Sequence, residues 1–201
     1  MLNNIPPVTR GLLIANVTVF LLQVVTGPRL IFTWGLWPPG VTTATGESAF
    51  RLWQLVTYSF LHGGFAHLFF NMFALWMFGS EIERVMRRDR YLTYYFVCVI
   101  GAAVTQLATS GMFEGPPAPT IGASGGVFGI LLAYGLAYPH RRVMLIFPPI
   151  PMPAWLFVTL YGLLELYLGI TQTAAGIAHF AHLGGMIGGF VLLQYWANRK
   201  R

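Results

Sequence analysis

The amino-acid sequence predicts an all-α, polytopic membrane protein built as a bundle of six transmembrane helices. Of its 201 residues, 56% are hydrophobic and only 9% are charged, whereas soluble domains carry about 25% charged residues. The mean hydropathy is +0.63. The few charges leave long neutral stretches, and a membrane-spanning helix needs roughly 20 mainly apolar residues. The charge-free stretches are residues 11–28, 30–46, 52–80, 91–113, 115–140, 143–164 and 166–198.

Six of these stretches are expected to contain helices. Residues 30–46 include "WPPGVTTATG", whose prolines and glycines break helices, so a long first loop is expected over 27–63. The first hydrophobic segment has no cleavage-type small-residue site after it and is expected to remain as a helix. No repeat or soluble second domain is visible, so residues 1–201 are expected to form a single membrane domain. Its helices are expected near 10–26, 64–84, 91–112, 123–139, 153–170 and 179–197.

The basic residues predict the orientation, because Lys and Arg favour the cytoplasmic side. With six spans, ten of the twelve basic residues fall on the side that holds both termini, and only Arg29 and Arg51 fall opposite. Both termini are therefore expected in the cytoplasm. A basic rim beside anionic lipid accounts for the net charge of +6, so the lipid bilayer is an expected partner and nucleic acid is not. The single cysteine, Cys98, rules out an intramolecular disulfide and offers no metal cluster, and neither a metal nor a cofactor is expected.

Five polar residues stand inside or at the edge of the expected helices, where each is costly and indicates function. They are His67, Asn71, Ser124, His179 and His182. The second, fourth and sixth expected helices all run inward from the outer side, and each carries one or more of these residues near its start. Three distant segments are therefore expected to bring a histidine-asparagine pair, a serine and a histidine to one layer.

Most of these residues have a simpler explanation when each is taken alone. Ser124, in "GASGG", fits a closely packed helix seam, and a histidine at position 62, 67 or 179 fits the membrane interface. Asn71 lies one turn after His67 on the same helix face, and its mid-helix amide needs a partner. The joint occurrence of these residues favours a site.

A serine hydroxyl becomes nucleophilic when a histidine accepts its proton, and His182 is the expected base. Glu165 is taken as the acidic residue within the membrane. It is expected to lie deeper than Ser124 and His182, so a Ser-His dyad that does not include it is predicted. Acyl transfer also needs donors for the developing oxyanion. The backbone N–H groups at the start of the fourth helix, together with the His67 and Asn71 side chains, are expected to supply them.

The glycines are expected to position this dyad. Gly185 and Gly189 lie nearly in line with His182 on the helical wheel and form a small-residue face, while Gly122 and Gly125 clear space around Ser124. Close contact between the fourth helix, through Gly125, Gly126 and Gly129, and the sixth is expected to bring Ser124 Oγ to the His182 ring. His179 is expected to point toward the cavity mouth and to reach water.

In combination, "HLFFN", "GASGG" and "AHLGGMIGG" resemble the rhomboid family of intramembrane serine proteases. The resemblance covers nearly the whole chain and matches the six-helix core common in bacteria. It implies a serine endopeptidase of the bacterial inner (plasma) membrane whose active site opens to the outer side. The implied substrates are transmembrane proteins with a single span, cut near the outer end of the helix.

The resemblance also assigns roles to residues. It implies Ser124 as nucleophile, His182 as general base, and an oxyanion hole formed by His67, Asn71 and the Ser124 backbone N–H. Phe128 is implied to stack on the catalytic histidine. The first loop carries Trp53-Gln54 where the family has a Trp-Arg pair, and "TQTAAG", residues 171–176, is implied to be a movable cap.

Two alternatives belong to other functional classes. His67 and His182 could ligate a b-type haem across the bundle, which would leave Ser124 and Asn71 unexplained. A catalytically inactive membrane scaffold is the second alternative, and such a protein should lack the nucleophile or the base.

Overall fold

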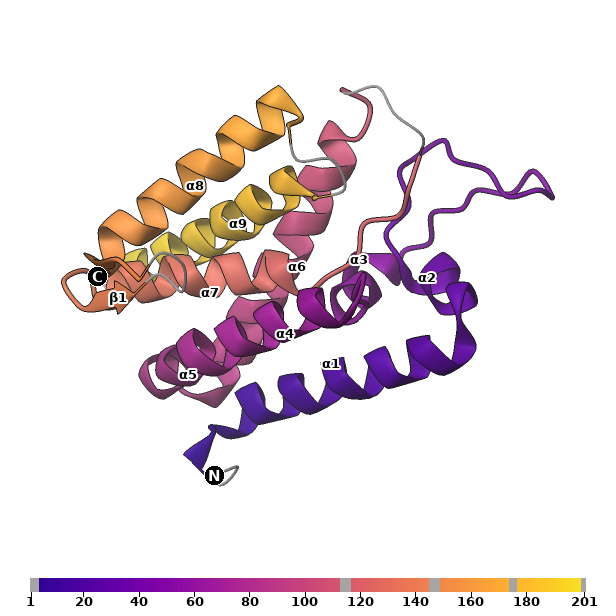
Figure 1. Cartoon of the computed structure of the whole chain (residues 1–201). Helices are drawn as coiled ribbons and strands as arrows, with labels where there is room; N and C mark the ends of the chain where they lie inside the picture. Colours follow the sequence, from indigo (N-terminus) through magenta and orange to yellow (C-terminus); the bar gives the residue numbers. More distant parts are fainter. Residues whose placement is uncertain (1–3, 113–116, 145–148, 174–176, 200–201) are drawn as a thin grey trace.

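The computed structural model describes residues 4–112, 117–144, 149–173 and 177–199, and these are mostly helical (Figure 1). Within these ranges, three helices are long and apolar enough to cross a membrane by length and composition. They are α1 (Pro7–Thr26), α6 (Arg88–Thr109) and α8 (Ala154–Thr171). The helical membrane architecture is thus confirmed at this level, while the count of six spans stays a prediction.

Each of the other three expected helices also corresponds to a helical segment. The segment expected near 64–84 is a continuous run of α4 (Phe65–Ala74), a π-helical turn η3 (Leu75–Gly79) and α5 (Ser80–Met86). The last expected helix is α9 (His179–Asn198). The fourth is α7 (Ser124–Ala137), which has only 14 residues. It is shorter than a full span, and it begins at the candidate nucleophile.

The expectation of a long loop over 27–63 is wrong in part. This segment contains the short helices α2 (Pro28–Trp34) and α3 (Gln54–Thr57) and the 3-10 turn η2 (Tyr58–Phe60). Pro28 opens α2 at a position where proline is favoured because no backbone donor is needed there, and Gly27, with φ of 67°, turns the chain between α1 and α2. The helix-breaking prolines that suggested a loop lie beyond α2.

The all-α prediction also omits a small antiparallel sheet. Strand β1 (Arg142–Met144) pairs with β2 (Pro151–Pro153), with Val143 opposite Met152. The pairing joins the end of α7 to the start of α8. Prolines at both ends of β2 are compatible with a two-stranded sheet, in which every strand is an edge.

Gln54 organises the first loop from a buried position. Its Oε1 accepts the backbone N–H groups of Trp37 at 3.3 Å and Arg51 at 3.2 Å. Its Nε2 donates to the carbonyls of Thr33 at 3.3 Å and Ala49 at 3.1 Å. The amide thus uses both of its donors and both of its acceptor positions, and it ties α2 and the following loop to α3. Gln54 stands at the position where the resemblance implies an arginine.

The glycines of α7 face α6 as well as α9, whereas the sequence led us to expect the contact with α9. A Cβ on Gly126 would clash with the Tyr95 ring, and one on Gly129 would clash with Cys98. On α9, a Cβ on Gly185 would overlap the backbone of Gly125, as expected, but one on Gly189 would meet Tyr94 and Cys98 of α6. The seam is therefore a junction of three helices, α6, α7 and α9.

Glu83 of α5 anchors the first helix. Its carboxylate is buried and accepts the N–H of Val8 at 2.9 Å and of Thr9 at 2.7 Å. These donors belong to the first turn of α1, where N–H groups have no intrahelical acceptor and a negative charge is favoured. This carboxylate therefore has a structural role that is remote in sequence from the candidate site.

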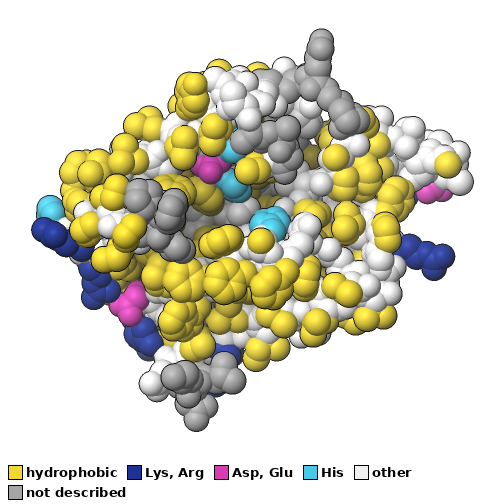
Figure 2. Space-filling model, viewed as in Figure 1, with side chains coloured by type: hydrophobic (Ala, Val, Ile, Leu, Met, Phe, Trp, Pro, Cys, Tyr) yellow, Lys and Arg dark blue, Asp and Glu magenta, His cyan; other side chains and the backbone are white. Residues whose placement is uncertain are grey.

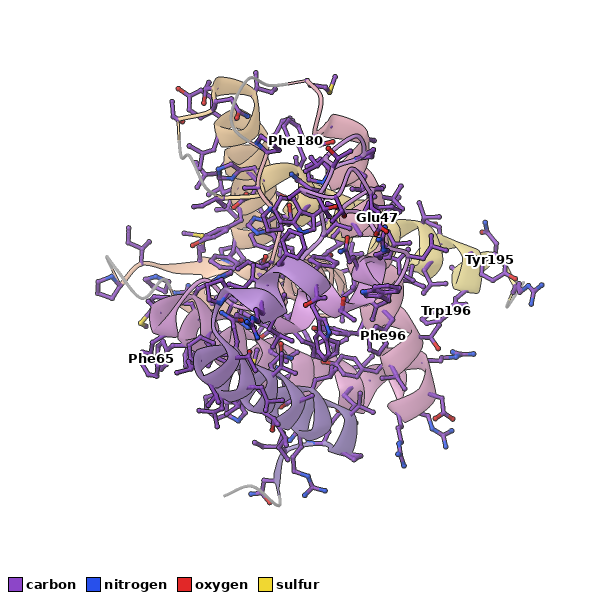
Figure 3. The ribbon with its side chains drawn as sticks, turned by 90° about the vertical axis from the view of Figure 1, so that its right-hand side faces the viewer. Glu47, Phe65, Phe96, Phe180, Tyr195 and Trp196 are labelled. Carbon is purple, nitrogen blue, oxygen red and sulfur yellow. The ribbon has the colours of Figure 1, made fainter. Side chains whose placement is uncertain are left out.

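The charged residues and the exposed apolar residues occupy different regions of the surface. Both chain termini lie at the end of the molecule where α5 and β1 are found (Figure 1). Figure 2 shows Lys and Arg side chains gathered at this end, a smaller group at the opposite end, and a broad hydrophobic region between them. Aromatic side chains such as Phe65 and Tyr195 point outward from the helices (Figure 3) and are largely exposed. This distribution is the one expected of a protein surrounded by lipid.

Candidate active site

Ser124 and His182 are brought into hydrogen-bond contact by α7 and α9. Ser124 is the first residue of α7, His182 lies one turn into α9, and Ser124 Oγ is 2.8 Å from His182 Nε2. The contact depends on the close approach of the two helices at Gly185, where a side chain would overlap the Gly125 backbone. Ser124 is half-buried and His182 is buried.

Glu165 lies on the other side of the His182 ring, contrary to the expectation from the sequence. Its Oε2 is 2.8 Å from His182 Nδ1 and 2.6 Å from His179 Nδ1. Glu165 is six residues from the end of α8, and His182 is three residues after the start of α9. Since these ends are joined by a short connection, the two side chains lie at similar depth. The expectation of a deeper Glu165 is wrong.

The expectation that His179 reaches water is also wrong, because its side chain is 4% exposed. Gly169 explains why α8 and α9 approach so closely here. A Cβ at Gly169 would lie 3.3 Å from the Cβ of His179 and 3.2 Å from the Phe180 ring. A spacing rule could have found this cluster: an acid near the end of one helix faces histidines near the start of the next antiparallel helix.

His67 presents one ring nitrogen toward Ser124. Its Nδ1 accepts the N–H of Gly63 at 3.1 Å, so the proton of the neutral ring is on Nε2. A Cβ on Gly122 would lie 3.0 Å from His67 Nε2 and 3.5 Å from Ser124 Oγ. The Nε2–H edge of His67 therefore comes near Ser124 across the space that the missing side chain of Gly122 leaves open.

Asn71 is buried one turn after His67, and its Nδ2 donates to the His67 carbonyl at 2.9 Å. Among the hydrogen bonds of the described residues, it makes none with Ser124 or His182. The amide carries a second N–H, which is not used in this bond. The structure therefore ties Asn71 to the backbone of His67.

His62, which precedes α4, is a further buried neighbour. Its ring centroid is 5.1 Å from that of His67, although the sequence suggested an interfacial residue. Burial and, to a smaller extent, the proximity of His67 lower the pKa of the His62 imidazole to about 4. His62 is therefore neutral at pH 7 and places no positive charge beside His67.

Phe128 stacks on His182 with a centroid distance of 4.3 Å and an interplanar angle of 6°. It lies one turn after Ser124 on α7, so one helix carries both the hydroxyl and the ring that covers the imidazole. With one face covered and both nitrogens hydrogen-bonded, the His182 ring is held in one orientation.

The occupied nitrogens of His182 also bear on ligand binding. A haem ligand needs a free ring nitrogen, so the hydrogen bonds to Ser124 and Glu165 disfavour the haem alternative. The ligating atoms of Glu165, His179 and His182 lie within 4.8 Å of one another and could hold a metal ion. Tetrahedral ligands about a zinc ion, however, stand about 3.3 Å apart, so the N···O distances of 2.6 and 2.8 Å are those of hydrogen bonds.

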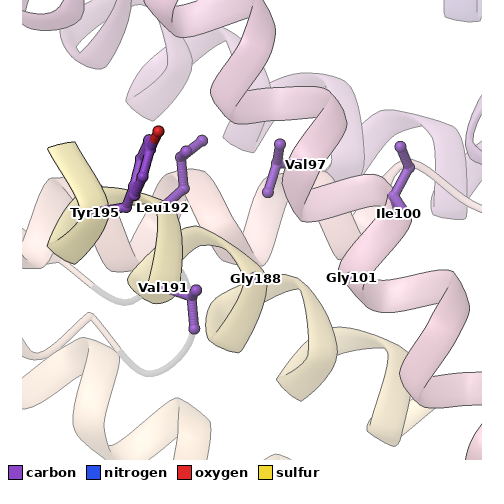
Figure 4. A pocket seen from close by; sticks show the side chains of 7 residues that line it. All are labelled: Val97, Ile100, Gly101, Gly188, Val191, Leu192 and Tyr195. Atoms are coloured by element: carbon purple, nitrogen blue, oxygen red, sulfur yellow. The ribbon is translucent and has the colours of Figure 1, made fainter.

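Figure 2 shows histidine side chains and an acidic side chain together at a hollow in the hydrophobic surface. A separate groove of about 440 Å³ lies between α6 and α9 (Figure 4). Its lining residues are Val97, Ile100, Gly101, Gly188, Val191, Leu192 and Tyr195. Apart from the Tyr195 phenol, they carry no group suited to acid, base or nucleophilic chemistry, so the candidate site is the cluster around His182.

Known proteins resemble this chain over much of its length. A family model described as "Rhomboid domain" matches residues 49–199. Rhomboid protease GluP of Bacillus subtilis is 34% identical over 140 residues, which are 69% of this chain and 25% of that protein. Rhomboid protein 1, mitochondrial, of Saccharomyces cerevisiae is 28% identical over 150 residues, 71% of this chain and 41% of that protein.

Rhomboid protease GlpG of Yersinia pestis is similar over more of the chain. It is 25% identical over 198 residues, 96% of this chain and 64% of that protein. The chain thus spans less than two thirds of the length of each of these relatives.

Proposed function

The chain belongs to the rhomboid family, and we propose that it is an intramembrane serine endopeptidase in which Ser124 is the nucleophile and His182 the general base. The observation that carries the proposal is the 2.8 Å hydrogen bond between Ser124 Oγ and His182 Nε2. It joins the start of α7 to α9 across 58 residues of sequence. A packing serine would not require a histidine there.

The reaction begins when Ser124 Oγ forms a bond to the carbonyl carbon of the scissile peptide and its proton passes to His182 Nε2. The negative oxygen is stabilised by the Ser124 backbone N–H, the His67 Nε2–H and the free N–H of Asn71. The C–N bond then breaks, His182 gives its proton to the leaving nitrogen, and an acyl-enzyme remains. Water attacks the acyl carbon, loses its proton to His182, and expels Ser124 Oγ, which takes that proton back.

The proposed substrates are transmembrane segments, cut near their outer ends. The 14 residues of α7 rise about 21 Å, while the hydrocarbon core is about 30 Å thick. A helix of this length that ends at the cytoplasmic boundary begins below the outer surface, which supports a site at that depth, open to the outer side. We propose six spans in a single membrane domain, 1–201, located in the bacterial inner membrane. The cap proposed over 171–176 falls partly on residues 174–176, outside the described part of the chain.

The test is cleavage of a single-span reporter protein by the purified protein and by its Ser124→Ala variant. We expect the variant to be inactive and as stable as the wild type, since it loses one oxygen at a site rich in small residues. A fluorophosphonate probe should label the wild type at Ser124 and leave the variant unlabelled. Cleavage by Ser124→Ala at the wild-type rate would overturn the assignment of the nucleophile.

A further inference from the structure

We propose that Glu165 and His179 form a positioning unit for His182, so that the site operates as a Ser-His-Glu triad whose acid is held by a second histidine. This inference rests on the proposed function, because it concerns the base of the same reaction. It differs from the dyad that the sequence suggested. Its basis is the convergence of two histidine Nδ1 atoms on one oxygen of a buried carboxylate.

The two short contacts are both satisfied by one arrangement of protons. A carboxylate oxygen can accept a hydrogen bond from each of the two neighbouring nitrogens. Both contacts are therefore satisfied when Glu165 is ionised and each Nδ1 carries a hydrogen. A buried carboxylate needs such partners, because an unpaired charge away from water is strongly disfavoured.

This arrangement selects the active tautomer of His182. With the hydrogen on Nδ1, the Nε2 of the neutral ring has a free lone pair, and that atom faces the Ser124 hydroxyl at 2.8 Å. When Nε2 takes the serine proton, the ring becomes a cation whose Nδ1–H already points at the carboxylate. Glu165 thus orients the base and stabilises the charge that it acquires, as the acid of a serine protease triad does.

His179 holds Glu165 in place from the other side. The Glu165 side chain is long, and a single hydrogen bond to His182 would leave it free to rotate about several torsions. The second bond, from His179 Nδ1, fixes the same oxygen from a residue one turn earlier on the same helix. The acid is therefore aligned with α9, the helix that carries the base.

The principal test is Glu165→Gln, which keeps the shape and removes the charge. The amide is uncharged and can present either its carbonyl oxygen or its NH₂ group to the two histidines, so it no longer fixes both Nδ1–H groups or stabilises a charged His182 ring. We expect kcat to fall by at least tenfold, toward the roughly 10⁴-fold loss known for a triad acid changed to an amide. KM should change by less than about threefold, because Glu165 is not proposed to touch the substrate.

The matched control is Glu83→Gln, which removes a second buried carboxylate. Glu83 binds the first turn of α1, so this variant should lose thermal stability and keep kcat. If Glu165→Gln retains kcat within twofold of the wild type while Ser124→Ala is inactive, the inference is wrong and the proposed function stands. If Glu83→Gln loses as much kcat as Glu165→Gln, the inference is also wrong, because the loss of activity would then follow the loss of stability.

His179→Gln tests the second part of the unit. We expect an intermediate loss of kcat, and we expect the double variant with Glu165→Gln to be no slower than Glu165→Gln alone, because residues that act as a unit are not additive. If the losses of kcat in the two single variants multiply in the double variant, His179 acts independently of Glu165, which would contradict the proposed unit.

The tautomer itself can be measured without any substrate. In protein labelled with ¹⁵N-histidine, we expect the ring nitrogens of His182 to report a protonated Nδ1 in the wild type and a mixture of tautomers in Glu165→Gln. The His182 signals are assigned by their loss in His182→Gln. This measurement decides the inference even if the wild type fails to cleave the reporter, an outcome that would count against the proposed function alone. An unprotonated Nδ1 in the wild type would refute the inference.

Discussion

Among single residues, Gly122 controls the geometry of the candidate site as directly as the residues that carry the chemistry. It has φ of +132°, and a Cβ there would lie 2.9 Å from Cε1 and 3.0 Å from Nε2 of His67. Both distances are shorter than an ordinary van der Waals contact. Glycine is therefore required at this position for two reasons. It adopts the backbone conformation without strain, and it leaves room for the His67 ring to approach Ser124.

We therefore expect Gly122→Ala to reduce kcat by at least tenfold, because the methyl group displaces the proposed oxyanion donor of His67. Loss of one such donor typically costs about 10²–10³ in turnover. Gly40→Ala is the control, since Gly40 has φ of +87° with nothing within 4 Å of its Cβ position. It should show a similar backbone strain, about 1–2 kcal/mol, with kcat unchanged. Equal kcat in Gly122→Ala and Gly40→Ala would argue against the role of His67.

Among the helices, the contact between α7 and α9 determines whether Ser124 and His182 meet. A Cβ on Gly185 would overlap the carbonyl oxygen of Gly125. The atoms it meets belong to the backbone, which cannot move aside as a side chain can. The two helix axes must separate to admit even one methyl group. His182 lies one turn from Gly185, so the separation is transmitted to the hydrogen bond with Ser124.

Gly185→Ala should accordingly slow fluorophosphonate labelling of Ser124 by at least tenfold and lower the thermal midpoint. Overpacking of this kind usually costs about 1–3 kcal/mol. The comparison is Gly11→Ala on α1, where nothing lies within 4 Å of the Cβ position; it should keep the labelling rate and be equally or more stable, since alanine favours helices. A wild-type labelling rate in Gly185→Ala would show that the seam does not position the site.

The sequence predicted the long helices well because their signal is local. Runs such as 91–112 and 153–170 are apolar over roughly the length of a span, and they match α6 and α8 closely. The short helix α2 and the hairpin of β1 and β2 were missed, because segments of seven residues or fewer have little periodicity and depend on their neighbours.

The site was predicted in part, for a related reason. Ser124, His67 and His182 stood out as polar residues near the starts of helices that run in one direction. Glu165 and His179 were misplaced because their contact depends on how closely α8 packs on α9 at Gly169, and tertiary packing of this kind leaves no periodic pattern. Counting residues outward from the connection between α8 and α9 would have shown that Glu165 and His179 lie at similar depth.

For the whole molecule, the distribution of charge predicts the direction in which the site opens. Both termini and the main group of basic side chains lie at one end (Figures 1 and 2). At this end, Arg141 forms a 3.0 Å ion pair with Glu81, which joins the segment after α7 to α5. Ten of the twelve basic residues belong to this side in the proposed topology, so the positive-inside rule predicts that this side faces the cytoplasm.

This topology can be tested with cysteine labelling, because the native Cys98 is fully buried and should not react. We expect Ala44→Cys, in the exposed first loop, to react with a membrane-impermeant maleimide on intact cells. His140→Cys, exposed between α7 and β1, should react only after the membrane is permeabilised. Since α4, α7 and α9 begin at the end opposite His140, labelling of Ala44→Cys alone would mean that His67, Ser124 and His182 open to the outer side. The reverse pattern would place the site on the cytoplasmic side and require substrates to be cut there.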